Sequence, residues 1–265
     1  MIGLGICFDQ GGGRKGIVIA GDRARSFLPG VIGESFPFYQ LGDLPLVFLP
    51  AGASSAIALD FKRRIQEFVS ESLREFSCDG LRNAFPKLYE LLRMMARYYR
   101  SEEENGIFMD FLIGGSDGSG DVLLYYGYID CSGAVNIEDI PATTGYALSL
   151  VGAREGYLLL KEWTEGMGEL PERVAVAMAI QLLQVLREIR RDISDKIDLA
   201  VLKNGDVNIL SDEHLEGIGF KGFLNVQWRA TIRWLKDTCA NPHLAPWSLK
   251  QLLRRRAASL KEDER

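Results

Sequence analysis

The chain has few of the residues that build zinc sites. Its 265 residues include four cysteines and two histidines, and no two cysteines stand in a CxxC spacing. These residues are Cys7, Cys78, Cys131, Cys239, His214 and His243. Because a zinc site needs clustered Cys or His ligands, we expect no metal site and no cofactor, and we interpret the cysteines as buried, reduced thiols.

Long apolar runs and a strong charge of either sign are also absent. No stretch approaches the roughly 20 apolar residues of a transmembrane helix. The opening string MIGLGICFDQ has no basic segment and no small-residue cleavage site, so we expect no signal peptide, no membrane partner and a cytoplasmic location. The net charge of −5 argues against nucleic acid as the partner.

Short apolar strings separated by turns predict four strands near the beginning of the chain. They are IGLGICF, GIVIAGD, VIGESFPFYQL and PLVFLPAG. The Gly-rich string GGGRK between the first two predicts a hairpin turn, since no phosphate-loop pattern is present. Pro37 and Pro45 are expected at or near strand ends, where a missing N–H is tolerated.

The hydrophobic period then becomes helical. Apolar residues at helical spacing over 57–76 and again over 81–99 predict an antiparallel pair of helices. FMDFLIGG and VLLYYGYID predict further strands, and SGAVNIEDIPATTGYAL is expected to be extended. Helices are predicted over 153–163 and 171–190, followed by the strand pair IDLAVL and VNIL around an Asn-Gly turn.

Strand hairpins separated by helix pairs leave no βαβ unit. This order favours an α+β fold, a layered sandwich of antiparallel sheets with helices packed on the outer faces. Sheets covered on both faces explain why GIVIAG and DFLIGG are apolar throughout. We predict this sandwich domain over 1–215 and a C-terminal helical extension over 216–265. The basic run Arg254–Arg256 is interpreted as a solvated helix face.

Several strings in this order resemble proteasome core subunits, which belong to the N-terminal nucleophile (Ntn) hydrolase superfamily. GIVIAGDRARS resembles the second strand and turn of that family, and FYQLGDLPLVFLPAG resembles its next two strands. DFLIGGSD resembles a later strand, and RRDISDKIDLAVLKNGDVNILSDEHLE resembles the last strands. The resemblance covers residues 1–215 and implies a four-layer αββα sandwich, in which two antiparallel β-sheets are flanked by helices.

The resemblance also implies a mechanism. In the family, the hydroxyl of an N-terminal threonine attacks a peptide carbonyl, and the free α-amine, with a pKa of about 8, acts as the base. A neighbouring lysine keeps the local field positive, and an aspartate on the second strand orients that lysine. A backbone N–H at an Ala-Gly corner stabilises the oxyanion, and a second aspartate supports the terminus.

Three positions of this chain match that pattern. Asp22 in AGDR takes the place of the first aspartate, Gly52 in PAGAS takes the oxyanion corner, and Asp192 in RRDIS takes the place of the second aspartate. Turn or helix-cap chemistry is the alternative interpretation of the two aspartates, because Asp is common in both.

The two groups that carry out the chemistry have no counterpart. The nucleophile position falls on Met1, or on Ile2, and neither side chain is a nucleophile. The lysine position falls on residues 36–38, and no lysine lies between Lys15 and Lys62. We therefore assign no catalytic residue, and we expect no propeptide whose removal exposes a threonine.

Three functions remain open. The first is a non-catalytic or divergent structural subunit of an oligomeric assembly, either a homo-oligomer in one or more rings or a complex with partner subunits, because family members stack into rings. The second is an active Ntn-type peptidase or amidohydrolase with another nucleophile or with cleavage at Thr143 or Thr144. The third is a binding module for small molecules or proteins, with a pocket at Asp22. The first hypothesis needs the fewest assumptions.

Overall fold

A computed structural model gives the fold. It describes residues 2–9, 15–28, 31–34, 36–73, 75–102, 108–142, 145, 147–152, 155–164, 168–189 and 193–217. The predicted extension from residue 218 onward, including Cys239 and Arg254–Arg256, lies outside these residues. Met1, Thr143, Thr144 and Asp192 lie outside them as well.

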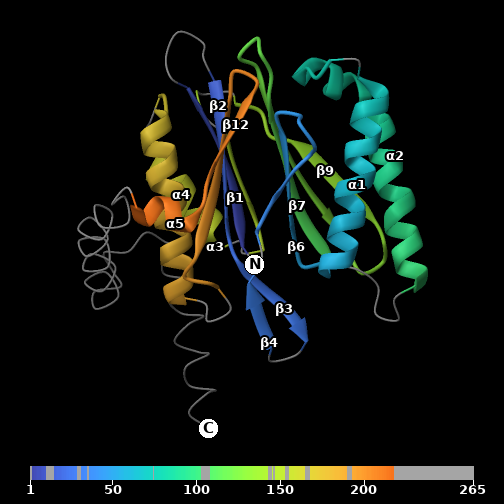
Figure 1. The fold of residues 1–265 in the computed structure, drawn as a ribbon, viewed down its shortest axis with the longest axis horizontal. Helices are drawn as coiled ribbons and strands as arrows, with labels where there is room; N and C mark the ends of the chain where they lie inside the picture. Colours follow the sequence, from blue (N-terminus) through green and yellow to red (C-terminus); the bar gives the residue numbers. More distant parts are fainter. Residues whose placement is uncertain are drawn as a thin grey trace.

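Strands and helices alternate in groups along the chain (Figure 1). The strands are β1 (Gly3–Asp9), β2 (Lys15–Asp22), β3 (Ala24–Leu28), β4 (Val31–Glu34), β5 (Tyr39–Gln40), β6 (Leu46–Ala51), β7 (Met109–Ser116), β8 (Val122–Ile129), β9 (Val135–Asp139), β10 (Ala147–Val151), β11 (Ile197–Lys203) and β12 (Asp206–Leu210). The helices are α1 (Ser55–Ser72), α2 (Cys78–Glu102), α3 (Glu155–Thr164), α4 (Glu172–Ile189) and α5 (Asp212–Gly217).

Two five-stranded antiparallel sheets form the centre of the molecule. The first sheet has the order β10-β1-β2-β11-β12, and the second has the order β5-β6-β7-β8-β9. A separate two-stranded ribbon, β3-β4, projects from the sandwich near the start of β1 (Figure 1). Helices α3 and α4 lie on the outer side of the first sheet, and α1 and α2 lie on the outer side of the second (Figure 1).

Three apolar clusters hold the four layers together. One lies between the first sheet and α3–α4, one lies between the two sheets, and one lies between the second sheet and α1–α2. Strand β2 contributes to two of them, with Val18 and Ala20 on the helix side and Ile17 and Ile19 on the inter-sheet side. Both faces of this strand are therefore buried, which confirms the prediction made from its continuous apolar string.

The predicted four-layer αββα sandwich is confirmed, with differences at the level of single strands. The chain forms six strands before α1, whereas the sequence predicted four. The string VIGESFPFYQL, predicted as one strand, is divided between β4 and β5, with Pro37 between them. Pro37 cannot donate to a strand ladder, which agrees with its place in this interruption. Helix α1 ends at Ser72, so Phe76 lies outside the helix in which it was predicted.

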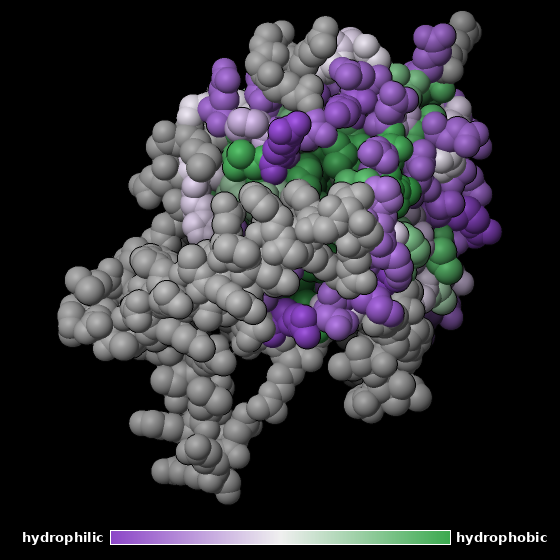
Figure 2. Space-filling model, turned by 60° about the vertical axis from the view of Figure 1, so that its left-hand side comes forward, coloured by the Kyte–Doolittle hydropathy of each residue, from purple (hydrophilic) through white to green (hydrophobic). Residues whose placement is uncertain are grey.

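None of the described helices is long and apolar enough to cross a membrane. On the face shown in Figure 2, hydrophilic side chains cover much of the described surface, and apolar side chains gather in a central hollow.

Candidate functional site

The ends of three strands of the first sheet meet at Asp22. This residue is the last of β2, and its side chain is fully buried. The backbone N–H of Ile2, immediately before β1, donates to Asp22 Oδ1. The N–H of Ser194, just before β11, donates to Asp22 Oδ2 over 3.0 Å. The backbone N–H of Asp22 in turn donates to the carbonyl oxygen of Ile2 at 3.1 Å.

Arg23, the next residue, lies between two carboxylates. Its guanidinium donates two hydrogen bonds of 2.7 Å to Asp198 of β11 and two of 2.9 Å to Glu213 of α5. The hydrogen bonds that Arg23 donates to Asp198 and Glu213 raise the pKa of Arg23. In turn, the hydrogen bond from Arg23 lowers the pKa of Glu213 to about 2. Because Asp198 is fully buried, this bidentate pair compensates a charge that is costly to bury alone.

A third carboxylate, that of Asp212, continues the network. The N–H of Asp212 donates to Asp198 Oδ1 at 3.0 Å, and Asp212 Oδ1 accepts from the N–H of Ile197 at 2.8 Å. These bonds tie the beginning of α5 to the beginning of β11. The sequence analysis did not identify Arg23, Asp198 or Asp212. Asp198 could have been identified from the sequence, because it is an acidic residue inside the apolar string IDLAVL. A carboxylate that is buried in a strand needs a partner.

Aromatic side chains and a proline occupy the stretch where the family pattern places its lysine. The ring of Phe36 lies 5.0 Å from the guanidinium carbon of Arg23 in a cation–π contact. Phe36 and Phe38 pack edge to face with ring centres 6.4 Å apart. Pro37 lies against Gly21, where an added Cβ would approach Pro37 Cβ to 2.6 Å. Phe36 and Pro37 therefore contact Arg23 and Gly21, the two residues next to Asp22 in the chain.

Gly52, predicted at the oxyanion corner, directly follows β6 on the second sheet. Its backbone has φ of +97°, which strongly favours glycine. An added Cβ would lie 2.9 Å from the carbonyl oxygen of Phe108. Close to this corner, Asp110 pairs with Ala51 in the ladder between β6 and β7 and is nearly buried. Its carboxylate accepts from the Tyr126 hydroxyl at 3.4 Å and from the Gly152 N–H at 3.3 Å.

Of the predicted site residues, the structure describes Asp22 and Gly52. Asp22 lies beside Ile2, which is 1% exposed and carries an aliphatic side chain. Gly52 directly follows β6 of the second sheet. Met1 and Asp192 lie outside the described residues, although Ser194, two residues after Asp192, contacts Asp22. The carboxylates of Asp22 and Asp198 thus link the ends of neighbouring strands. The side chain of Ile2 is not a nucleophile.

The cysteines follow the prediction in part. Cys7 and Cys78 are buried, as expected, and burial is the largest cause that raises the pKa of the Cys7 thiol to about 12. The prediction was wrong for Cys131, which is exposed in the turn between β8 and β9. Cys78, Asp117 and Asp121 bring three possible ligand atoms within 4.8 Å of one another. Asp117, however, accepts the Cys78 N–H at 2.9 Å, which is the bonding of a helix start.

Comparison with known proteins identifies the fold. No protein-family model matches the chain, and no curated protein sequence matches it. Among solved structures, Anbu from Hyphomicrobium sp. strain MC1 is similar with 17% identity and a TM-score of 0.60, over 89% of this chain and 97% of that one. Eukaryotic HslV from Trypanosoma brucei gives 16% identity and a TM-score of 0.47, over 76% of this chain and 99% of that one. The likeness to Anbu shows that the chain shares the fold of that protein, the proteasome-like αββα sandwich.

Proposed function

We propose that the chain is a non-catalytic structural subunit of an assembly built from copies of itself. The hydrogen bonding of Asp22 carries the proposal. In the family pattern this aspartate orients a lysine, but here each carboxylate oxygen accepts a backbone N–H, one from Ile2 and one from Ser194. The residue that meets Asp22 is aliphatic and buried, so it offers no hydroxyl for attack on a carbonyl.

The surroundings of Asp22 support the same proposal. Arg23, the cation that follows Asp22, is bound on both sides by Asp198 and Glu213. Its charge is compensated by these carboxylates. Both carboxylate oxygens of Asp22 accept backbone N–H groups, and Pro37 packs against Gly21, the preceding residue, so the hypothesis of a small-molecule pocket at Asp22 gains no support.

A peptidase assay tests the first half of the proposal. The full chain is incubated with blocked tetrapeptides that carry a C-terminal aminomethylcoumarin, with and without an epoxyketone inhibitor directed at N-terminal threonine. We expect no release of fluorophore above buffer. Turnover that the inhibitor abolishes would overturn the proposal. Intact mass spectrometry of the same sample is expected to show one species, and a fragment beginning at Thr143 or Thr144 would favour the peptidase hypothesis instead.

The outer face of α1 and α2 is the surface we assign to assembly. Leu59, Met94 and Tyr98 are 50%, 61% and 60% exposed there. Met94 and Tyr98 line a groove of about 490 Å³ between the helices, together with Arg63 of α1. Exposed apolar side chains next to charged ones are typical of surfaces that bind another protein, and a second copy of the chain is the partner we propose.

Native mass spectrometry tests the second half. We expect the full chain to form a discrete oligomer, and the double variant Met94→Glu and Tyr98→Glu to shift it to the monomer. Ile209→Glu is the matched control, because Ile209 is also an exposed apolar residue, 42% accessible, but lies on β12. A monomeric wild-type chain, or equal dissociation of both variants, would contradict the assigned surface.

A further inference from the structure

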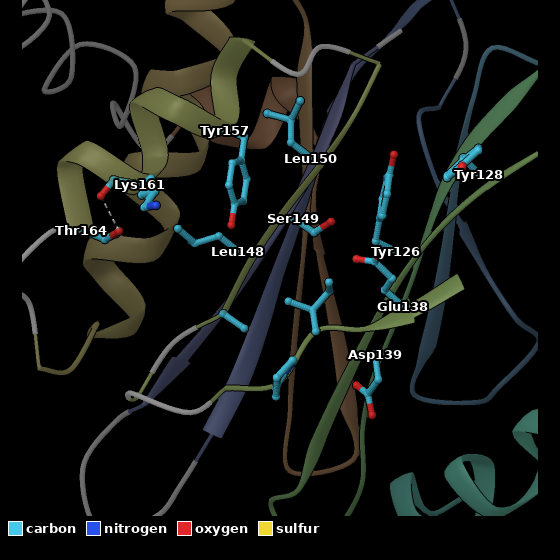
Figure 3. Close-up of a pocket in the computed structure, with 13 residues that line it drawn as sticks. Tyr126, Tyr128, Glu138, Asp139, Leu148, Ser149, Leu150, Tyr157, Lys161 and Thr164 are labelled. Atoms are coloured by element: carbon cyan, nitrogen blue, oxygen red, sulfur yellow. Dashed lines mark hydrogen bonds between the residues drawn. The ribbon is translucent and has the colours of Figure 1, made fainter. Parts of the chain in front are cut away.

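A cleft of about 710 Å³ runs along one edge of the first sheet (Figure 3). Four successive residues of β10 line it: Ala147, Leu148, Ser149 and Leu150. Successive residues of a strand point to opposite faces, so a cleft lined by all four follows the edge of the strand and not one of its faces. Its volume falls within the range of about 300–1,000 Å³ that is usual for binding sites.

The cleft has two different walls. Helix α3 contributes Tyr157 and Lys161 on one side, and Tyr126 and Tyr128 of β8 with Glu138 of β9 form the other. In Figure 3, Leu148 points toward the α3 wall and Ser149 points toward Tyr126. A strand placed beside β10 therefore has one row of side chains on the α3 wall and one row on the β8–β9 wall.

β10 differs from the other edge strands of the two sheets. Edge strands in proteins are commonly protected from unwanted pairing by shortness or by charged residues. Of the other edges, β5 has two residues, β9 carries Glu138 and Asp139, and β12 begins with Asp206. The sequence of β10, ALSLV, has no charge, and among the described residues β10 pairs only with β1.

Two free charges define the chemistry of the walls. Asp139 lies 3.7 Å from Arg82, whereas the adjacent Glu138 has no ion-pair partner among the described residues. The ammonium of Lys161 on the opposite wall likewise has no ion-pair partner in the described part of the chain. A basic side chain is thus favoured on the Glu138 wall and disfavoured on the α3 wall, where Leu148 and Tyr157 favour an aliphatic one.

We propose that the free edge of β10 binds an extended peptide segment of another protein as an added strand. The segment alternates aliphatic side chains, which face α3, with basic side chains, which face Glu138. Backbone hydrogen bonds to β10 supply affinity, and the two walls supply specificity, as in other recognition by strand addition. This site is separate from Asp22 and from the α1–α2 face, so the proposal does not depend on the function proposed above.

Fluorescence anisotropy with the full chain tests this proposal. The probe is a fluorescein-labelled heptapeptide of alternating leucine and lysine. One comparison peptide has the same composition with leucines and lysines in two blocks, and another is N-methylated at its central residues, which removes its backbone donors. We expect saturable binding of the alternating peptide and a loss of about tenfold or more for both comparison peptides. Equal binding of all three would overturn the proposal.

Charge variants separate the cleft from general attraction to an acidic chain. We expect Glu138→Lys to weaken binding about fivefold or more. Glu71→Lys is the matched control, because Glu71 is an exposed glutamate on α1 and the net charge changes equally. An equal loss in both variants would show that only net charge matters.

Deuterium exchange identifies the edge itself. Exchange of the β10 amides that point away from β1 is expected to slow when the alternating peptide is added. If these amides are already protected without peptide, and the protection grows with protein concentration, a second copy covers β10 and the proposal is wrong.

Discussion

At the scale of single residues, the carboxylate of Asp22 connects three segments that are far apart in the sequence. It joins the beginning of β1, the end of β2 and the loop before β11 through two N–H donors. The place of Asp22 on the second strand was predicted from the string AGDR. Its partners could not be predicted, because a single sequence does not show which backbone donors a folded chain brings to a carboxylate.

Replacing Asp22 by alanine leaves the N–H groups of Ile2 and Ser194 without this acceptor. Since each lost acceptor costs about 1–3 kcal/mol, we expect the free energy of unfolding to fall by about 2–5 kcal/mol. Urea denaturation measures the loss. Asp195→Ala, at an exposed position in the same loop, is the control and is expected to change the value by less than about 0.5 kcal/mol. Similar small effects for both variants would contradict a structural role of Asp22.

The ion pair of Glu213 with Arg23 predicts how the thermal stability depends on pH. Arg23 lowers the pKa of Glu213 from its ordinary 4.5 to about 2. A carboxylate whose pKa is lowered on folding stabilises the folded state at any pH above its ordinary pKa. This stabilisation is lost as the pH falls from the ordinary pKa through the pKa of the folded state. We expect wild type to have a higher Tm than Glu213→Gln at about pH 6, with the difference shrinking below about pH 4.5. A difference that does not vary between about pH 6 and pH 3 would argue against the Arg23 pair.

At the scale of elements, α2 is anchored to the turn between β7 and β8. Asp117 Oδ2 accepts the N–H of Cys78, and Asp117 Oδ1 accepts the N–H of Ser119 and of Asp121. Burial raises the pKa of Asp117, but hydrogen bonds from these groups and from the Ser119 hydroxyl outweigh it, so the pKa lies below its ordinary value. One side chain thus sets where the helix begins relative to the second sheet.

Asp117→Asn tests this anchor. The amide replaces one acceptor oxygen with a donor, so we expect a loss of about 1–3 kcal/mol in the free energy of unfolding, measured in urea. Asp79→Asn is the comparison, since the Asp79 side chain is 84% exposed in the first turn of the same helix. Its surface ion pair with Arg82 is worth about 1 kcal/mol or less. The anchor would be refuted by an equal loss in the two variants.

The elements differ in how well the sequence predicted them. Helices α1, α2 and α4 were clear because each buries one stripe of a long helical period. Strands β9 and β10 were expected only as one extended stretch, and the structure places them on different sheets. A period of two shows which face of a strand is buried but not which strand lies beside it, so the pairing of β1 with β10 could not be predicted.

At the scale of the whole molecule, the two sheets approach closely near the site. Gly3 and Gly21 pair across β1 and β2, and added Cβ atoms there would meet Leu49 and Pro37 at 2.4 and 2.6 Å. The layered architecture was predictable because continuous apolar strings require cover on both faces. The close approach was not, because glycine in a strand has several possible causes.

Gly21→Ala measures how tightly the layers fit. The new methyl group would press on the rigid ring of Pro37, and we expect a loss of about 1–3 kcal/mol in stability. Gly118→Ala is the control, because among the described residues no heavy atom beyond its chain neighbours lies within 4 Å of a Cβ added there. Thermal unfolding of both variants gives the comparison. Tolerance of alanine at Gly21 would mean that residues 36–38 move away from β2 at little cost.

The composition of the two sheets has a consequence for synthesis on the ribosome. The second sheet and its helices use one continuous stretch, from β5 to β9, whereas the first sheet combines β1 and β2 with β10, β11 and β12. A nascent chain therefore completes the second sheet and its helical cover first. The β1–β2 hairpin emerges earliest, yet its strand neighbours β10 and β11 and the helices α3 and α4 that cover its outer face are translated late. This outer apolar face therefore lacks its native cover until late in translation, and we expect chaperones to bind there.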